Sequence, residues 1–214
     1  MSPMDEILPG VYHWTTDHPN IGKEVSSYWL DAEAVLIDPF VPRDGGIEWF
    51  HGRDAPPAAV LLSCRHHLRD SERFAATFGC PILCNRAGLH EFEDRDLEVH
   101  GFDPGDELPG EVHAIEVGAL SPDETALYLP AHRALLIADG VVRESPDEPL
   151  GFVPGQLMDD PEETRAGLLE AFEQLLDRLD FDHLLLAHGG PVLRDGREQL
   201  RLFVDEGGRT AFEL

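Results

Sequence analysis

The sequence predicts a layered α/β architecture in a single domain spanning residues 1–214. Its length and its hydrophobic fraction of 42% are enough for one full core. Strand patterns dominate the first two thirds of the chain, a strand–helix–strand unit lies among them, and a helix, a strand and a helix close the chain. This order indicates two sheet halves, each covered by helices.

The first half of the chain is predicted to form a hairpin followed by a βαβ unit. Asp31–Glu33 make the hairpin turn, and the apolar run after it ends at Asp38. Asp70 or Ser71 is the expected N-cap of the helix in the βαβ unit, and Gly79 follows that helix. The expected strands are 7–14, 25–40, 58–63 and 81–84, and the expected helices are 45–53 and 71–78.

The second half of the chain contains the strongest helix signal. Asp160 and Pro161 occupy cap and first-turn positions, and apolar residues then recur at helical spacing from Leu168 to Leu179. Ala131–Arg133 predict a hairpin, and residues 143–160, rich in Pro, Gly, Asp and Glu, predict a long loop over one face. The expected strands are 97–102, 111–117, 124–130, 134–142 and 183–188, and the expected helices are 161–179 and 196–206.

The charge of the chain excludes several classes of partner. The 42 acidic residues outnumber the 16 basic ones, which gives a net charge of −26. Such a surface repels phosphate backbones and anionic lipid heads, so no nucleic-acid or membrane partner is expected. The acidic composition indicates adaptation to high salt or a GC-rich coding sequence, and composition does not separate the two.

The cysteines and the N-terminal segment predict a soluble cytoplasmic protein. Cys64, Cys80 and Cys84 are an odd number with no disulfide-like framework, so reduced thiols are expected. Cys80 and Cys84 lie in a short apolar strand and are expected to be core residues. The first residues lack the basic start and apolar run of a signal peptide, and no apolar stretch is long enough to span a membrane.

Residues 60–74, VLLSCRHHLRDSERF, are the most informative segment. They place an apolar strand, a polar turn and a helix start in succession. The turn resembles the H-x-H-x-D-H turn of the metallo-β-lactamase superfamily, in which the motif follows a buried strand and carries metal ligands. Further segments that resemble the family are LPGVYHW (8–14), SSYWLDAEAVLIDP (26–39), SPDETALYLPAHRALLIADGVV (121–142) and LLLAHGGPV (184–192).

The resemblance implies a four-layer αβ/βα sandwich and a metal site whose ligands are partly replaced. In the family, seven side chains hold two metals. Three ligand positions match in this chain, namely His66, Asp139 and His188. The other four are changed: Cys64 and Arg69 stand for the first and third histidines of the turn, Leu68 for its aspartate, and Leu120 for the histidine before Ser121.

These replacements predict at most one metal. Leucine offers no donor atom, and Arg69 places a positive charge at the position of the second cation. Cys64, His66 and Asp139, with His188 as a fourth donor, form a set that accepts zinc, with iron or manganese as alternatives and a metal-free protein as a further one. Without a metal, Asp139 needs Arg69 or a histidine as its partner, and an ion pair between Arg69 and Asp139 is one hypothesis.

Three functions remain open from the sequence. The first is a mononuclear hydrolase of a small ester, thioester or lactone. The second is an inactive protein that binds a small ligand in the ancestral cleft, or a regulatory protein, and the third is a metal-independent thiol enzyme centred on Cys64. The resemblance also implies a homodimer, although no apolar stripe marks a dimer face.

Overall fold

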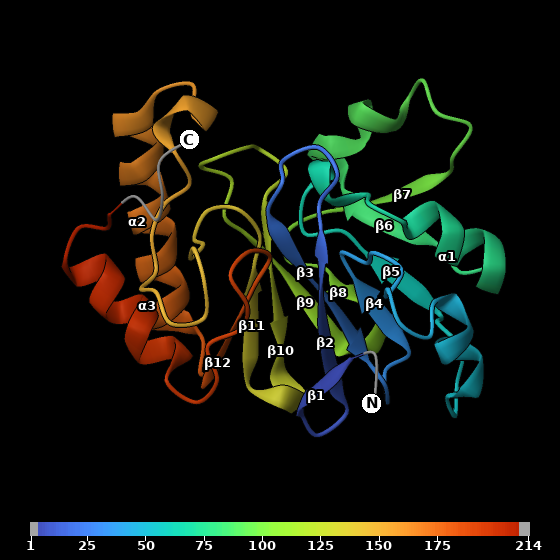
Figure 1. Cartoon of the computed structure of the whole chain (residues 1–214). Helices are drawn as coiled ribbons and strands as arrows, with labels where there is room; N and C mark the ends of the chain where they lie inside the picture. Colours follow the sequence, from blue (N-terminus) through green and yellow to red (C-terminus); the bar gives the residue numbers. More distant parts are fainter. Residues whose placement is uncertain (1–3, 210–214) are drawn as a thin grey trace.

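The computed structural model describes residues 4–209, so residues 1–3 and 210–214 of the expected domain lie outside the described part. A seven-stranded sheet keeps its strands in chain order (Figure 1). Its first four strands pair antiparallel and its last four pair parallel. The strands are β1 (Asp5–Leu8), β2 (Val11–Asp17), β3 (Glu24–Leu30), β4 (Val35–Ile37), β5 (Ala59–Leu61), β6 (Ile82–Asn85) and β7 (Val99–Phe102).

A second sheet has five strands in the order β12-β11-β10-β9-β8. Only β11 and β12 pair parallel, because α2 connects them. The turn Pro130–His132 joins β10 to β11, which confirms the predicted hairpin. The strands are β8 (Glu107–Leu108), β9 (Val112–Glu116), β10 (Thr125–Leu129), β11 (Ala134–Ile137) and β12 (His183–Leu186).

Three α-helices cover the outer faces of the two sheets. Figure 1 shows α2 and α3 beside the second sheet and α1 on the opposite side of the molecule. None of the described helices is long and apolar enough to cross a membrane. The α-helices are α1 (Ser71–Phe78), α2 (Pro161–Arg178) and α3 (Gly196–Asp205). Short 3-10 helices are η1 (Ile47–Gly52), η2 (Arg65–His67), η3 (Arg86–Phe92), η4 (Pro109–Glu111), η5 (Pro130–His132) and η6 (Gly155–Leu157).

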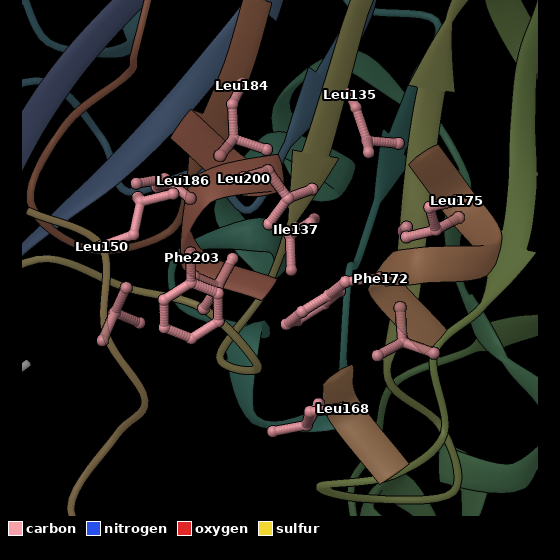
Figure 2. Close-up of a cluster of buried hydrophobic side chains, with 14 of the residues drawn as sticks. Leu135, Ile137, Leu150, Leu168, Phe172, Leu175, Leu184, Leu186, Leu200 and Phe203 are labelled. Carbon is pink, nitrogen blue, oxygen red and sulfur yellow. The ribbon is translucent and has the colours of Figure 1, made fainter. Parts of the chain in front are cut away.

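The alternation of side chains along the strands produces the four layers. In β10, Leu127 and Leu129 face the other sheet, whereas Ala126 and Tyr128 face the helices. One buried cluster therefore lies between the sheets, and two others lie between each sheet and its helices. Figure 2 shows the cluster under α2 and α3, where Phe172 meets strand residues such as Ile137. This is the predicted αβ/βα sandwich.

One local expectation is confirmed, and two differ from the structure. Asp160 caps α2 as predicted, because its Oδ1 accepts the N–H groups of Glu162 and Glu163 at 3.1 Å each. Asp70 precedes α1, but its Oδ2 accepts the Val41 N–H at 2.8 Å and makes no cap. The segment 143–160 is not only a surface loop, since it contributes four buried apolar residues to the cluster under the helices: Leu150, Phe152, Val153 and Met158.

Candidate metal centre

Polar residues follow four buried strands at one edge of the sandwich. Strands β4 and β5 are parallel in the first sheet, and β11 and β12 are parallel in the second. Asp38, Cys64, Asp139 and His188 come directly or one to three residues after the ends of these strands. The carboxyl ends of parallel strands are where α/β proteins most often hold ligands. The two edges coincide here, because His67 Nε2 lies 3.4 Å from Asp139 Oδ2 across the sheets.

Cys64, His67 and Asp139 form the group of side chains suited to a metal ion. One donor atom from each lies within 4.8 Å of the others. Cys64 and His67 are buried, at 2% and 5% exposure. His66 is exposed, because η2 is a single tight turn in which neighbouring residues project about 120° apart. The structure therefore places His67, and not the expected His66, in this group of donor atoms.

Asp38 holds the His67 ring in one orientation. The Asp38 Oδ2 atom lies 2.9 Å from His67 Nδ1, and Ser63 donates both its N–H and its hydroxyl to the same carboxylate. A carboxylate only accepts hydrogen bonds, so Nδ1 carries a proton. The opposite ring atom, Nε2, faces Asp139. This carboxylate–histidine arrangement is the one that orients metal-binding histidines in proteins.

The charged groups of the site strongly shift the pKa values of one another. Burial acts to lower the pKa of His67, but the carboxylates of Asp139 and Asp38 hold that pKa well above its usual value. Burial acts to raise the pKa of Asp139, but His67 and His188 hold it well below its usual value. For Cys64, burial dominates and raises the pKa of the thiol to about 11. In the absence of a metal, the site holds an imidazolium between carboxylates and a neutral thiol.

His188 joins the group through Asp139. Its Nε2 lies 3.1 Å from Asp139 Oδ1, and its ring centre is 6.2 Å from that of His67. The loop that carries it is held by Arg143, whose guanidinium donates to three successive carbonyl oxygens of this loop, those of Gly189, Gly190 and Pro191. Of the four expected site residues, the structure thus brings together Cys64, Asp139 and His188.

Arg69 does not pair with Asp139, and that hypothesis is wrong in this structure. Its Nη1 donates instead to the carbonyl oxygens of Ser26 and Asp38. The ion-pair partners of Asp139 in residues 4–209 are His67 and His188, so the alternative that a histidine fills this role is the one observed. Arg69 adopts a left-handed backbone conformation with φ of 48°, and its side chain reaches β3 and the end of β4.

Solved structures resemble the chain over nearly its whole length. A metallo-beta-lactamase family protein from Thermus thermophilus is 16% identical, with a TM-score of 0.67 over 93% of this chain and 79% of that protein. The DIM-1 metallo-beta-lactamase is 10% identical, with a TM-score of 0.72 over 96% and 97%. The chain has the metallo-β-lactamase fold.

A flavodiiron protein from Giardia intestinalis shares this fold in part of its length. It is 17% identical, with a TM-score of 0.66 over 95% of this chain and 59% of that protein. Identities this low establish the fold and leave the activity to the site. The chain matches no protein-family profile, and no curated protein is similar to it in sequence.

A two-metal centre of the kind that the metallo-β-lactamase resemblance implies does not fit these residues. Leu68 stands at one former ligand position and is 7% exposed within the hydrophobic cluster that covers the first sheet. Leu120 stands at another and packs against the cluster under α2 and α3. Both leucines therefore serve packing, and Arg69, a cation that donates to backbone carbonyls, offers no donor atom for a metal.

One metal fits. Sulfur, imidazole nitrogen and carboxylate oxygen converge from Cys64, His67 and Asp139, which is a donor set that zinc accepts. The Asp38 carboxylate fixes the His67 ring with Nε2 toward the other two donors. The Asp139 side chain is one-quarter exposed, so the group is reachable from solvent.

Two further acidic residues near the site could not be singled out from the sequence. Asp123 is fully buried and pairs with Arg65, so it ties the η2 turn to the segment before β10. Glu124 is buried next to it, and its Oε1 accepts the Gly140 N–H at 2.5 Å. Burial raises the pKa of Glu124 to about 8. In the sequence Asp123 directly precedes the expected strand 124–130 and Glu124 begins it, and neither position carries a functional signal.

Proposed function

We propose that this protein is a mononuclear metallohydrolase that acts on a small ester, thioester or lactone. Cys64, His67 and Asp139 are assigned as the metal ligands. The convergence of their donor atoms within 4.8 Å is the observation that carries the proposal. Zinc suits this mixed donor set best, and iron or manganese are the alternatives, since one structurally similar protein was solved in a di-iron-bound form.

A divalent ion at this position would supply Lewis-acid chemistry to a substrate carbonyl. The residues around the site would support the binding of such an ion in two ways. Asp38 keeps the proton on His67 Nδ1, which leaves Nε2 as the donor. Three protein ligands also leave an open coordination position, which catalysis requires.

His188 is assigned as a positioning residue, although the sequence placed it among the ligands. Its Nε2 lies 3.1 Å from Asp139 Oδ1, while Asp139 Oδ2 faces His67. The two oxygens of Asp139 thus serve two different partners. Holding Oδ1 fixes the carboxylate plane and directs Oδ2 toward Cys64 and His67.

The thiol-enzyme hypothesis is not supported by the surroundings of Cys64. The thiolate is the reactive form of cysteine, and burial raises the pKa of this thiol to about 11. The guanidinium of the neighbouring Arg65 is engaged in an ion pair with Asp123. The Cys64 side chain is also only 2% exposed, so a substrate does not reach it directly.

A metal-free protein that binds a small ligand is the second candidate. One observation favours it: His67 lies between the carboxylates of Asp38 and Asp139, and this charge pattern is stable without a metal. The two candidates differ in whether purified protein contains a metal, and in whether loss of that metal abolishes activity.

Metal analysis of two neighbouring histidine variants tests the proposal. Protein purified without chelators or a metal-binding tag is analysed for metal against protein concentration. The wild type and His66→Ala are expected to hold about one equivalent, because His66 is exposed, and His67→Ala to hold none. A wild type that takes up no zinc, iron or manganese would overturn the proposal in favour of the ligand-binding protein.

A second pair of variants covers the case in which His67→Ala does not fold. Cys64→Ala is expected to lose the metal, and Cys80→Ala, a buried cysteine outside the site, to keep it. Hydrolysis of a panel of small esters, thioesters and lactones should follow the metal content across the four variants. Hydrolysis that persists at full rate in metal-free Cys64→Ala contradicts the proposed mechanism.

A further inference from the structure

Arg69 carries two hydrogen-bond donors that have no partner in the fold. Its Nη1 is used by the carbonyl oxygens of Ser26 and Asp38. Its Nε and Nη2 atoms are shielded from solvent and make no hydrogen bond within residues 4–209. Unpaired buried donors are rare in native proteins, because each loses its hydrogen bonds to water without replacing them.

The Arg69 guanidinium interacts electrostatically with Asp38 and Asp139 but makes no direct contact with either carboxylate group. Among the described residues it forms no ion pair with a carboxylate. The nearest carboxylates are occupied, since Asp38 binds Ser63 and His67, and Asp139 binds the two histidines. A buried cation is costly unless it is paired, so this guanidinium is suited to an anion from outside the chain.

The shape of the unpaired edge selects the kind of anion. The Nε–H and Nη2–H groups of a guanidinium point in parallel and match the two oxygens of a carboxylate. Tetrahedral anions also bind arginine, but the remaining nitrogen of Arg69 is committed to backbone carbonyls. Only the two-pronged edge is available, which favours a planar partner.

Phe40 and His18 complete the surroundings of Arg69. The Arg69 Cζ atom lies 5.7 Å from the centre of the Phe40 ring, and the His18 ring meets the same phenyl ring edge-on at 5.6 Å. His18 Nδ1 accepts the Asn20 N–H at 3.2 Å, so its Nε2 carries the proton and is a further donor. Burial and the nearby positive charge of Arg69 lower the pKa of His18.

We propose that the Nε/Nη2 edge of Arg69 is a carboxylate-binding subsite beside the candidate metal centre. It takes the carboxylate of a small acid, with Phe40 against the guanidinium and His18 as the adjacent donor. That this acid is part of the hydrolysed substrate rests on the proposed function. The substrate class then narrows to an ester, thioester or lactone that also carries a free carboxylate.

Acetate and benzoate are the probes for this subsite. They are titrated into chelator-treated protein, and binding is followed by NMR, with sodium chloride at equal ionic strength and methyl benzoate as controls. Saturable binding of both acids is expected, with neither control competing. Binding that chloride or methyl benzoate reproduces would overturn the proposal.

Two arginine-to-lysine variants give the matched comparison. Arg69→Lys keeps the charge and removes the two-pronged edge, so its affinity for acetate is expected to fall at least about tenfold. Arg73→Lys makes the same change on a side chain that is 59% exposed on α1, and it is expected to bind as the wild type does. Equal affinity in Arg69→Lys and the wild type would overturn the assignment.

A measurement on the wild type decides the matter if Arg69→Lys does not fold. The methyl protons of bound acetate should show nuclear Overhauser contacts with the Phe40 ring protons, and contacts only to residues elsewhere refute the site. Failure of this subsite is distinguishable from failure of the hydrolase. Metal uptake without acetate binding removes the subsite alone, whereas acetate binding without metal uptake removes the hydrolase alone.

Discussion

The Asp38 carboxylate lies 2.9 Å from His67 Nδ1 and so joins residues that follow two parallel strands, β4 and β5. Asp38 itself adopts a left-handed backbone conformation, with φ of 47°, and is 1% exposed. A buried residue in this conformation, whose carboxylate accepts three hydrogen bonds from Ser63 and His67, is fixed by its surroundings. The orientation of the His67 ring is therefore set by the fold before any ligand arrives.

Replacing Asp38 with asparagine should weaken metal binding. The amide carries no charge and can donate to Nδ1, which would move the ring proton to Nε2 and block the donor atom. We expect the affinity for zinc to fall about 10–100-fold, measured by competition with a chromophoric chelator. Asp17→Asn, on an exposed residue paired with Arg43, is the control and should bind as the wild type does. An unchanged affinity in Asp38→Asn would mean that His67 is not a ligand.

Glu124 should make the stability of the protein fall as the pH rises. Burial raises the pKa of Glu124 to about 8, whereas an unfolded glutamate has its ordinary value of 4.5. The folded state therefore holds a proton that the unfolded state has released across this interval, so stability is lost from about pH 4.5 up to about pH 8. Glu124→Gln cannot ionise and should remove this dependence.

Urea unfolding at several pH values measures the effect of Glu124. Relative to the wild type, Glu124→Gln should gain about 1–3 kcal/mol in the free energy of unfolding between pH 5 and pH 9. The comparison uses the change with pH and not the absolute stability, because the buried amide adds an N–H₂ group that needs partners. Parallel pH profiles for the two proteins contradict a raised pKa.

Cys64 should resist alkylation in the metal-free folded protein. With burial raising the pKa of its thiol to about 11, the thiolate is about 100-fold scarcer at pH 7.5 than in an ordinary cysteine. Iodoacetamide should therefore label Cys64 slowly in native protein and rapidly in urea, as followed by peptide mass spectrometry. Rapid labelling of native Cys64 would falsify the assignment of a neutral thiol and revive the thiol-enzyme hypothesis.

The ion pair between Arg65 and Asp123 should matter for stability far more than an exposed pair does. Asp123 is fully buried, and Asp123→Asn leaves the Arg65 cation without its partner. We expect a loss of about 2–4 kcal/mol in the free energy of unfolding. Asp180→Asn makes the same change in an exposed pair with Arg133 and should cost much less, because water screens exposed pairs. Similar losses in both variants, measured by urea unfolding, would contradict this ranking.

Added salt should stabilise the protein. A net charge of −26 produces self-repulsion in the compact state, and ions screen repulsion between exposed charges. The melting temperature is expected to rise with sodium chloride concentration in the wild type. A melting temperature that stays flat or falls would show that the acidic surface does not limit stability, and would argue against adaptation to high salt.

The fold could be predicted from the sequence because each layer leaves a periodic signal. The apolar spacing from Leu168 to Leu179 marked the face of α2 that packs on the second sheet, and Asp160 marked its start. The run before Asp139 was apolar throughout because both faces of β11 are buried. The buried residues of segment 143–160 were hidden, since they follow no period and are separated by proline, glycine and acidic residues.

The candidate site was predictable only in part. Cys64, Asp139 and His188 follow buried strands, so their place at the edge of the sheets could be inferred from position alone. Which of the two adjacent histidines points inward depends on one tight turn, and a resemblance between motifs could not settle that. The partners of Arg69 are backbone carbonyls, which carry no sequence signature at all.

The candidate centre draws its ligands from both halves of the sandwich. Cys64 and His67 follow a strand of the first sheet, whereas Asp139 follows a strand of the second. An ion bound by all three residues would connect the two sheets, and separation of the sheets on unfolding would release the ion. Metal occupancy and thermal unfolding would then be thermodynamically linked, so metal should raise the melting temperature of the whole molecule. Even when no ion is bound, the ion pair between His67 and Asp139 still joins residues that follow strands of the two different sheets.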